Sequence, residues 1–242
     1  MDQGPPIIEF LGLPGAGKST LARRLISRCS ARGMFCGDLR SIARFKDNRP
    51  GHYARLAKFA ITRTRHLRPA ASLAAAVTPW TVARWWFAVG LSLWSYRLAM
   101  VRKRNYDLVV LDHGPLQSAW CVLLEGSLDD EQVLGDTLTR MLARHQLMFA
   151  FVHVDIDPEI AAARIEARGP MAAPFNRGRD ETRRLLGLHR TLLDQVLSVA
   201  EQRIGGPVLR LDGSLPLDFN DQRIDGFLSR LLARSLTAGA TR

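Results

Sequence analysis

One short segment near the start of the chain has the composition of a phosphate-binding loop. The run GLPGAGKST, from Gly12 to Thr20, satisfies the pattern G-x-x-x-x-G-K-[ST]. Its glycines permit positive backbone φ angles and place no Cβ atom between the backbone and a ligand. Successive N–H groups can then face an anion, and the N-terminus of a following helix adds positive potential. The pattern predicts binding of a nucleoside triphosphate, with ATP and Mg²⁺ as the expected pair.

The residues of this loop have different expected roles. Lys18 is predicted to reach the β- and γ-phosphates and to act in catalysis, and the Ser19 hydroxyl is predicted to ligate Mg²⁺. A chance glycine-rich turn is the alternative interpretation, but a strand-like run precedes the segment and a helical pattern follows it. The residues expected to contact the nucleotide are Gly12, Leu13, Pro14, Gly15, Ala16, Gly17, Lys18, Ser19 and Thr20.

Two aspartates are candidates for acid–base or metal chemistry. Asp112 directly follows the apolar run LVVL, and ligands bind at the carboxyl edge of a parallel sheet. Its carboxylate could ligate Mg²⁺ through the water shell or accept a proton from the attacking group. The alternative is an N-cap for the segment that begins at Pro115. Asp38, near the end of another strand-like run, is the second candidate for the general base, and the sequence leaves the choice between them open.

Several arginines surround a loop that follows the fourth strand-like run. Arg164 and Arg168 are four residues apart and therefore share a helix face. Guanidinium groups that close on a phosphoryl transition state stabilise its charge, and a closing loop excludes water. We interpret residues of about 168–180 as a lid. Arg164, which precedes it, and Arg168 are the candidate catalytic arginines, and Arg177 and Arg179 are the candidate substrate contacts. Ordinary surface arginines are the alternative.

Strand-like and helical segments alternate along the chain, and their folding must bring these residues together. Strand-like apolar runs lie at residues 7–11, 34–39, 106–112, 147–156 and 208–211, with helical patterns between them. Strands that alternate with helices predict a parallel sheet covered by helices on both faces. A length of 242 residues fits one α/β domain, residues 1–242.

A helical insert at about residues 41–104 carries most of the tryptophans. The segment from Pro69 to Tyr96 has Arg84 as its only charged residue, and it contains Trp80, Trp85, Trp86 and Trp94. Three interpretations stay open, namely core packing, an acceptor pocket that uses Trp85 and Trp86, or a surface for lipid or a partner. Arg40, just before the insert, is a candidate for acceptor binding.

The charge and cysteine content narrow the classes of partner. The chain has 34 Lys and Arg against 23 Asp and Glu, a net charge of +11, which favours anionic partners. We recognise no nucleic-acid module, so nucleic acid is not the expected partner. The 3 scattered cysteines form no CxxC pair, which argues against a disulfide framework or a zinc site and favours a cytoplasmic location. Peripheral membrane contact and a homodimer stay open.

The motifs also resemble those of a known group of enzymes. GLPGAGKST, LVVLDHG, VDIDPEIAAARIEARG and LDGS occur in the order seen in thymidylate-kinase-like and deoxynucleoside-kinase-like P-loop kinases. The resemblance covers nearly the whole chain and implies a three-layer α/β/α P-loop NTPase fold with a five-stranded parallel sheet, a helical insert and an arginine lid. It also implies that the loop near Asp212 and Gly213 lies close to the adenine. Thymidylate kinases carry an acceptor-binding arginine where this chain has His113, so we expect His113 to contact the acceptor.

The sequence therefore predicts an ATP-dependent phosphotransferase that acts on a small molecule. The acceptor could be a nucleoside, a nucleotide, a sugar or an antibiotic. A nucleotide-dependent regulatory or membrane-associated ATPase is the alternative, and a nucleic-acid 5′-end kinase is a further one.

Overall fold

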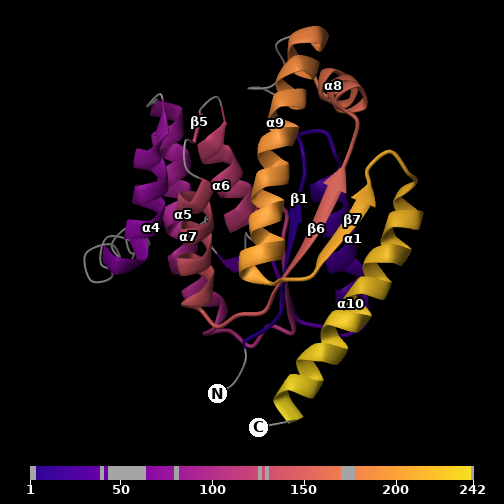
Figure 1. Ribbon diagram of the computed structural model, residues 1–242. Helices are drawn as coiled ribbons and strands as arrows, with labels where there is room; N and C mark the ends of the chain where they lie inside the picture. The colour runs from indigo at the N-terminus through magenta and orange to yellow at the C-terminus, as the bar shows by residue number, and fades with distance from the viewer. Residues whose placement is uncertain are drawn as a thin grey trace.

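The computed structural model describes residues 4–38, 41–42, 64–78, 82–124, 127–128, 131–169 and 178–240. Figure 1 shows a twisted central sheet with helices on both faces. The sheet strands are β1 (Ile7–Leu11), β2 (Cys36–Gly37), β4 (Leu108–Leu111), β6 (Phe149–Asp155) and β7 (Val208–Asp212). The helices are α1 (Lys18–Ala31), α4 (Thr64–Ala76), α5 (Val82–Val101), α6 (Pro115–Leu123), α7 (Glu131–Ala143), α8 (Pro158–Ala167), α9 (Arg179–Val199) and α10 (Leu217–Ala240).

The sheet is parallel, and β1 lies at its centre. The strand order is β2-β4-β1-β6-β7. Ile7 of β1 pairs with Val109 of β4 on one side and with Phe149 of β6 on the other. Every residue of β1 is buried, as expected for a central strand covered on both faces. The predicted α/β architecture with a five-stranded parallel sheet is confirmed.

Two layers of helices cover the sheet. Helices α6, α7 and α9 lie on one face, and α1 and α10 lie together on the other (Figure 1). Ion pairs join α1 to α10, including Arg28 to Asp221 at 2.6 Å and Arg32 to Asp225 at 2.8 Å. Because α1 begins at the end of the phosphate loop, this packing fixes the direction in which its N-terminus points.

The described part of the insert packs beside the first of these layers. Helix α4 contacts α5 and α7, and α5 contacts α6. Trp94 of α5 is fully buried, and its indole Nε1 donates to Ser118 Oγ of α6 at 2.8 Å. Trp94 therefore belongs to the core, as one of the three interpretations predicts. Trp80 and the side chains of Trp85 and Trp86 lie outside the described residues.

The structure differs from the predicted elements in several places. Strand β2 is shorter than residues 34–39, and α10 starts at Leu217 rather than near residue 221. The last turn of the α9 segment is a π-helix, Ala200–Ile204. A two-stranded antiparallel pair, β3 (Val77–Thr78) with β5 (Ser127–Leu128), was not predicted, because two-residue strands leave no periodic pattern. Among the described helices, none combines the length and apolar character needed to cross a membrane.

Candidate functional site

The phosphate loop follows β1 at the carboxyl edge of the sheet and leads directly into α1. Gly12, Gly15 and Gly17 have φ angles of 152°, 84° and 96°. A Cβ atom on Gly12 would lie 2.5 Å from Val154 O, and one on Gly15 would lie 2.8 Å from Ala161 O. Glycine is therefore required at these two positions both by the backbone conformation and by the close approach of neighbouring backbone.

Lys18 is held inside the curve of the loop. Its Nζ donates to Gly12 O at 2.7 Å and to Leu13 O at 2.9 Å. Burial lowers the pKa of Lys18 to about 8, and the nearby charge of Asp112 opposes this shift. Lys18 therefore lies where the sequence predicts contact with phosphate. Because its pKa is lowered, the ammonium group loses its proton at a lower pH than an exposed lysine does.

A cavity of about 540 Å³ opens beside this loop and has a cationic lining. Three basic side chains line it, Lys18, Arg23 and Arg168. Arg23 was not identified from the sequence, although it lies on the first turns of α1, where its Nε donates to Ser19 O at 3.0 Å. The other lining residues are Pro14, Gly15, Gly17, Ser19, Thr20 and Ile165. The cavity is therefore suited to a ligand with several negative charges.

Arg164 connects the phosphate loop to the turn after β7. Its Nη1 donates to Gly15 O at 3.3 Å and to Gly213 O at 3.0 Å. Gly213 lies so close to the loop that a Cβ atom there would be 3.0 Å from Ala16 O. The guanidinium of Arg164 therefore holds two loops together, whereas Arg168, one turn further along, reaches the cavity.

The other predicted lid residues are placed differently. Arg179, at the start of α9, forms an ion pair with Glu159 of α8 at 2.7 Å. Arg183 contacts the same carboxylate at 3.2 Å, so Arg179 and Arg183 tie the start of α9 to α8. Arg177 lies outside the described residues.

Asp112 and His113 directly follow the carboxyl end of β4, and Arg97 of α5 lies near enough to affect the pKa of His113. The charge of Asp112 raises the pKa of both Lys18 and His113, which places the carboxylate near both groups. Part of the His113 surface is open to solvent, but burial of the rest and the charges of Lys18 and Arg97 lower its pKa. The neutral imidazole is therefore favoured at neutral pH, when one ring nitrogen donates and the other accepts.

Arg97 is a residue that the sequence interpretation missed. Its guanidinium carbon lies 4.8 Å from the centroid of the Trp94 ring, within the range of a cation–π contact. Burial lowers the pKa of Arg97 to about 10. The signal in the sequence was weak, because Arg97 is one of two arginines, with Arg84, in a helix that is otherwise mostly apolar or small.

Asp38 is engaged in local structure. Its Oδ1 accepts from Ser41 N at 2.6 Å, and its own N–H donates to Ser41 Oγ at 2.8 Å. This reciprocal pair is typical of a residue that begins a helical turn. Arg40 lies outside the described residues.

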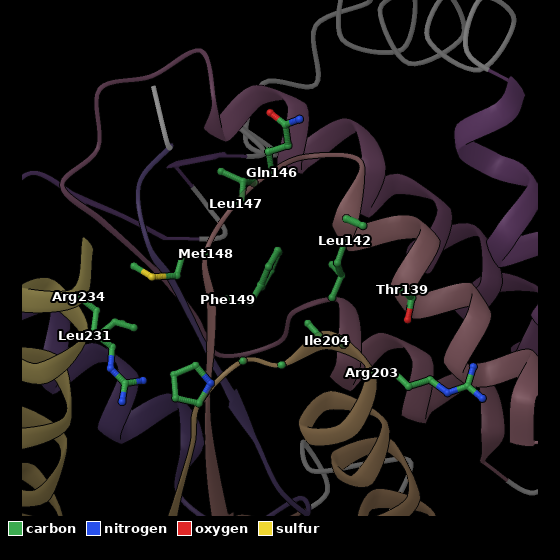
Figure 2. A pocket seen from close by; sticks show the side chains of 14 residues that line it. Thr139, Leu142, Gln146, Leu147, Met148, Phe149, Arg203, Ile204, Leu231 and Arg234 are labelled. Carbon is green, nitrogen blue, oxygen red and sulfur yellow. The ribbon is translucent and has the colours of Figure 1, made fainter. Parts of the chain in front are cut away.

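A second cavity lies at the opposite edge of the sheet. It measures about 350 Å³ and has apolar walls that include Leu142, Phe149 and Ile204. Figure 2 shows Arg203 and Arg234 on opposite sides of this cavity. Because Phe149 is the first residue of β6, this cavity lies at the amino edge, away from the phosphate loop.

A phosphate loop after the central strand of a parallel sheet in this order defines the P-loop NTPase fold. No family model and no curated protein matches the chain. Its fold matches a deoxyadenosine kinase from M. mycoides solved with dCMP and a flexible dCDP bound, with 15% identity, a TM-score of 0.55, and coverage of 93% of this chain and 99% of that one. The same enzyme with bound dATP matches with 16% identity, a TM-score of 0.50, and coverage of 93% and 98%. The predicted likeness to deoxynucleoside-kinase-like P-loop proteins is therefore confirmed at the level of fold.

Proposed function

We propose that the chain is an ATP-dependent phosphotransferase that moves the γ-phosphoryl group to a small-molecule acceptor. The observation that carries this proposal is the cationic cavity of about 540 Å³ beside the phosphate loop. Lys18, Arg23 and Arg168 surround a space bordered by loop glycines and by the N-terminus of α1. Backbone N–H groups, an ammonium and two guanidiniums together suit the several charges of a nucleoside triphosphate.

The side chains at this site suit a Mg²⁺ ion that binds together with the nucleotide. Within the described residues, no group of three or more His, Cys, Asp or Glu side chains could hold a metal ion. Mg²⁺ in phosphotransferases is commonly held by one or two protein ligands together with phosphates and waters. In our proposal Ser19 ligates the ion and Asp112 holds its water shell. The ion would neutralise charge on the phosphates when bound.

The chemistry then divides among a few residues of the chain. The acceptor oxygen attacks the γ-phosphorus, the bond to the bridging oxygen breaks, and ADP leaves. Lys18 and Arg168 stabilise the charge on the transferred group. Where the acceptor is a hydroxyl, Asp112 accepts its proton. Asp38 is the less suitable base, because its Oδ1 already accepts the Ser41 N–H.

The acceptor is proposed to bind on the side of α5 and His113. Arg97 brings the positive charge of a half-buried side chain over the Trp94 ring, and the neutral imidazole of His113 offers a donor and an acceptor. Five further residues are proposed to contact the acceptor substrate, namely Arg40, Trp85, Trp86, and Arg177 and Arg179 of the lid. In this proposal residues 1–242 form one kinase domain, with an insert at about 41–104 and a lid at about 168–180.

Transfer of label from [γ-³²P]ATP tests the proposal directly. The protein is incubated with Mg²⁺ and pools of nucleosides, nucleotides, sugars and aminoglycosides. Deoxynucleosides are tested first, because the matched structures belong to a deoxyadenosine kinase. We expect label on one class of small molecule with the wild-type protein and none with Lys18→Ala, which loses the loop ammonium.

Other outcomes distinguish the alternatives. Label found only as inorganic phosphate, with no acceptor in any pool, supports an ATPase. Label on the 5′ end of an added oligonucleotide supports a nucleic-acid kinase. If calorimetry detects no binding of MgATP or MgADP to the wild-type protein, the proposed function is wrong.

A further inference from the structure

The first turn of α6 makes hydrogen bonds to two parts of the chain that precede it by more than a hundred residues. The N–H groups of Leu116 and Gln117 donate to the Glu9 carboxyl group at 3.2 Å and 2.8 Å. The Gln117 side chain in turn accepts the Gly12 N–H on its Oε1 at 3.2 Å. Gln117 thus contacts both the central strand and the first residue of the phosphate loop.

Glu9 replaces the capping side chain that α6 lacks. The N-cap residue is Gly114, which has no side chain, and the next residue, Pro115, has no N–H. The two free N–H groups that follow would be unsatisfied inside the protein without a partner. Glu9 is fully buried and supplies both acceptor oxygens. A Cβ atom at position 114 would lie 2.3 Å from the Glu9 Cδ atom, so the fit between the two elements is tight.

This contact lies between the phosphate loop and the turn that carries Asp112 and His113. Asp112 and His113 immediately precede Gly114, so the position of the α6 N-terminus also sets the position of the turn that carries them. On the other side, Gly12 is held between Gln117 and the backbone of β6, where Val154 O allows no Cβ atom. A shift of the first turn of α6 would therefore move Gly12 relative to Asp112.

We propose that Glu9 and Gln117 are positioning residues that fix the start of the phosphate loop against the turn carrying Asp112 and His113. Neither side chain contacts the cavity beside the loop, so each acts through Gly12 or through α6. The proposal rests on the proposed nucleotide site, but the contact itself can be tested without catalysis.

The test uses Gln117→Met, which keeps the length of the side chain and removes its acceptor. MgADP affinity is measured by calorimetry, and amide hydrogen exchange is followed in the peptide that contains Gly12. We expect roughly 10-fold weaker binding, the scale for leaving one buried donor unsatisfied, together with faster exchange at the loop. Thr137→Val is the matched control, because it also removes a buried hydrogen bond, from Thr137 Oγ1 to Pro69 O at 3.1 Å, on a different helix. It should leave MgADP affinity and loop exchange unchanged.

Glu9→Gln provides a second variant if Gln117→Met does not fold. It keeps the shape of the side chain but turns an amide N–H₂ toward the backbone donors of α6. We expect weaker MgADP binding and faster exchange at the first turn of α6. Wild-type affinity and wild-type exchange in the folded variants would overturn the inference. If the wild-type protein does not bind MgADP, the proposed function fails, whereas the exchange measurement still decides whether Gln117 holds Gly12.

Discussion

Nucleotide affinity should fall as the pH rises through about 8, because Lys18 must carry its proton to bind phosphate. Burial lowers the pKa of Lys18 to about 8 in the free protein. A polyphosphate beside the ammonium favours its charged form and therefore raises that pKa in the complex. Binding is then coupled to proton uptake, which becomes costlier as the free protein loses the proton. Affinity should accordingly be greatest below the pKa of the free protein and decline above it.

The size of the effect follows from the pKa of the free protein. If only the protonated form binds tightly, the dissociation constant is proportional to 1 + 10^(pH − pKa). For a pKa near 8, affinity should fall roughly 10-fold between pH 7 and pH 9. The second ionisation of a phosphate group lies near pH 6, so the charge of the ligand changes little over this range.

Calorimetric titration with MgADP across this range measures the effect. Repeating it in buffers with different ionisation enthalpies should detect uptake of about half a proton near pH 8. Lys18→Arg is the control, because a guanidinium keeps its proton throughout the range. Burial also raises the pKa of Glu9 to about 8, so Glu9→Gln is titrated in parallel and should keep the pH dependence. A wild-type affinity that is constant from pH 7 to pH 9, or the same decline in Lys18→Arg, would refute the reasoning.

Three further predictions concern single side chains. Asp112→Asn should lower turnover by about 10²-fold or more while MgADP affinity measured by calorimetry changes little; near-normal turnover would leave Asp112 with a structural role only. Gly114→Ala should lower the free energy of unfolding by about 1–3 kcal/mol, because the new Cβ atom would lie 2.3 Å from the Glu9 Cδ atom; an unchanged melting temperature would contradict this. Burial raises the pKa of Glu9 from 4.5 to about 8, so the folded protein holds a proton that the unfolded chain releases. The stabilisation from this proton is present below pH 4.5 and is lost as the pH rises toward 8, by about 1.4 kcal/mol per pH unit. Denaturant titrations of Glu9→Gln should lack this decline, and a decline equal to the wild type would assign it to other groups.

The parts of the fold that the sequence predicts correctly are those encoded in contiguous residues. The loop from Gly12 to Ser19 and the apolar runs of β1, β4 and β6 each carry their signal within a few positions. A strand buried on both faces is rich in apolar residues, and a phosphate loop needs glycines at fixed spacing. Each pattern can therefore be recognised in the sequence without knowing which other elements pack against it.

The roles of individual polar side chains were harder to predict, because they depend on distant partners. Arg164 and Arg168 share one helix face, yet Arg164 donates to Gly15 O and Gly213 O while Arg168 lines the cavity. The difference is set by the distance from each guanidinium to two loops that lie far away in the sequence. Arg23 was missed for the same reason, since nothing in its local sequence distinguishes it from a solvated helix residue.

Glu9 shows how two local irregularities can explain each other. In the run IIEFL it is an acid in a strand that is otherwise apolar, and a buried carboxyl group requires donors. In the run DHGPLQ, helix α6 begins at Gly-Pro with no side chain to accept its first N–H groups. One segment has acceptors without donors, and the other has donors without acceptors. The structure pairs them at 2.8 Å and 3.2 Å. Unsatisfied polar groups on separate predicted elements therefore indicate which elements meet, and here they indicate contact between β1 and α6, beside the phosphate loop.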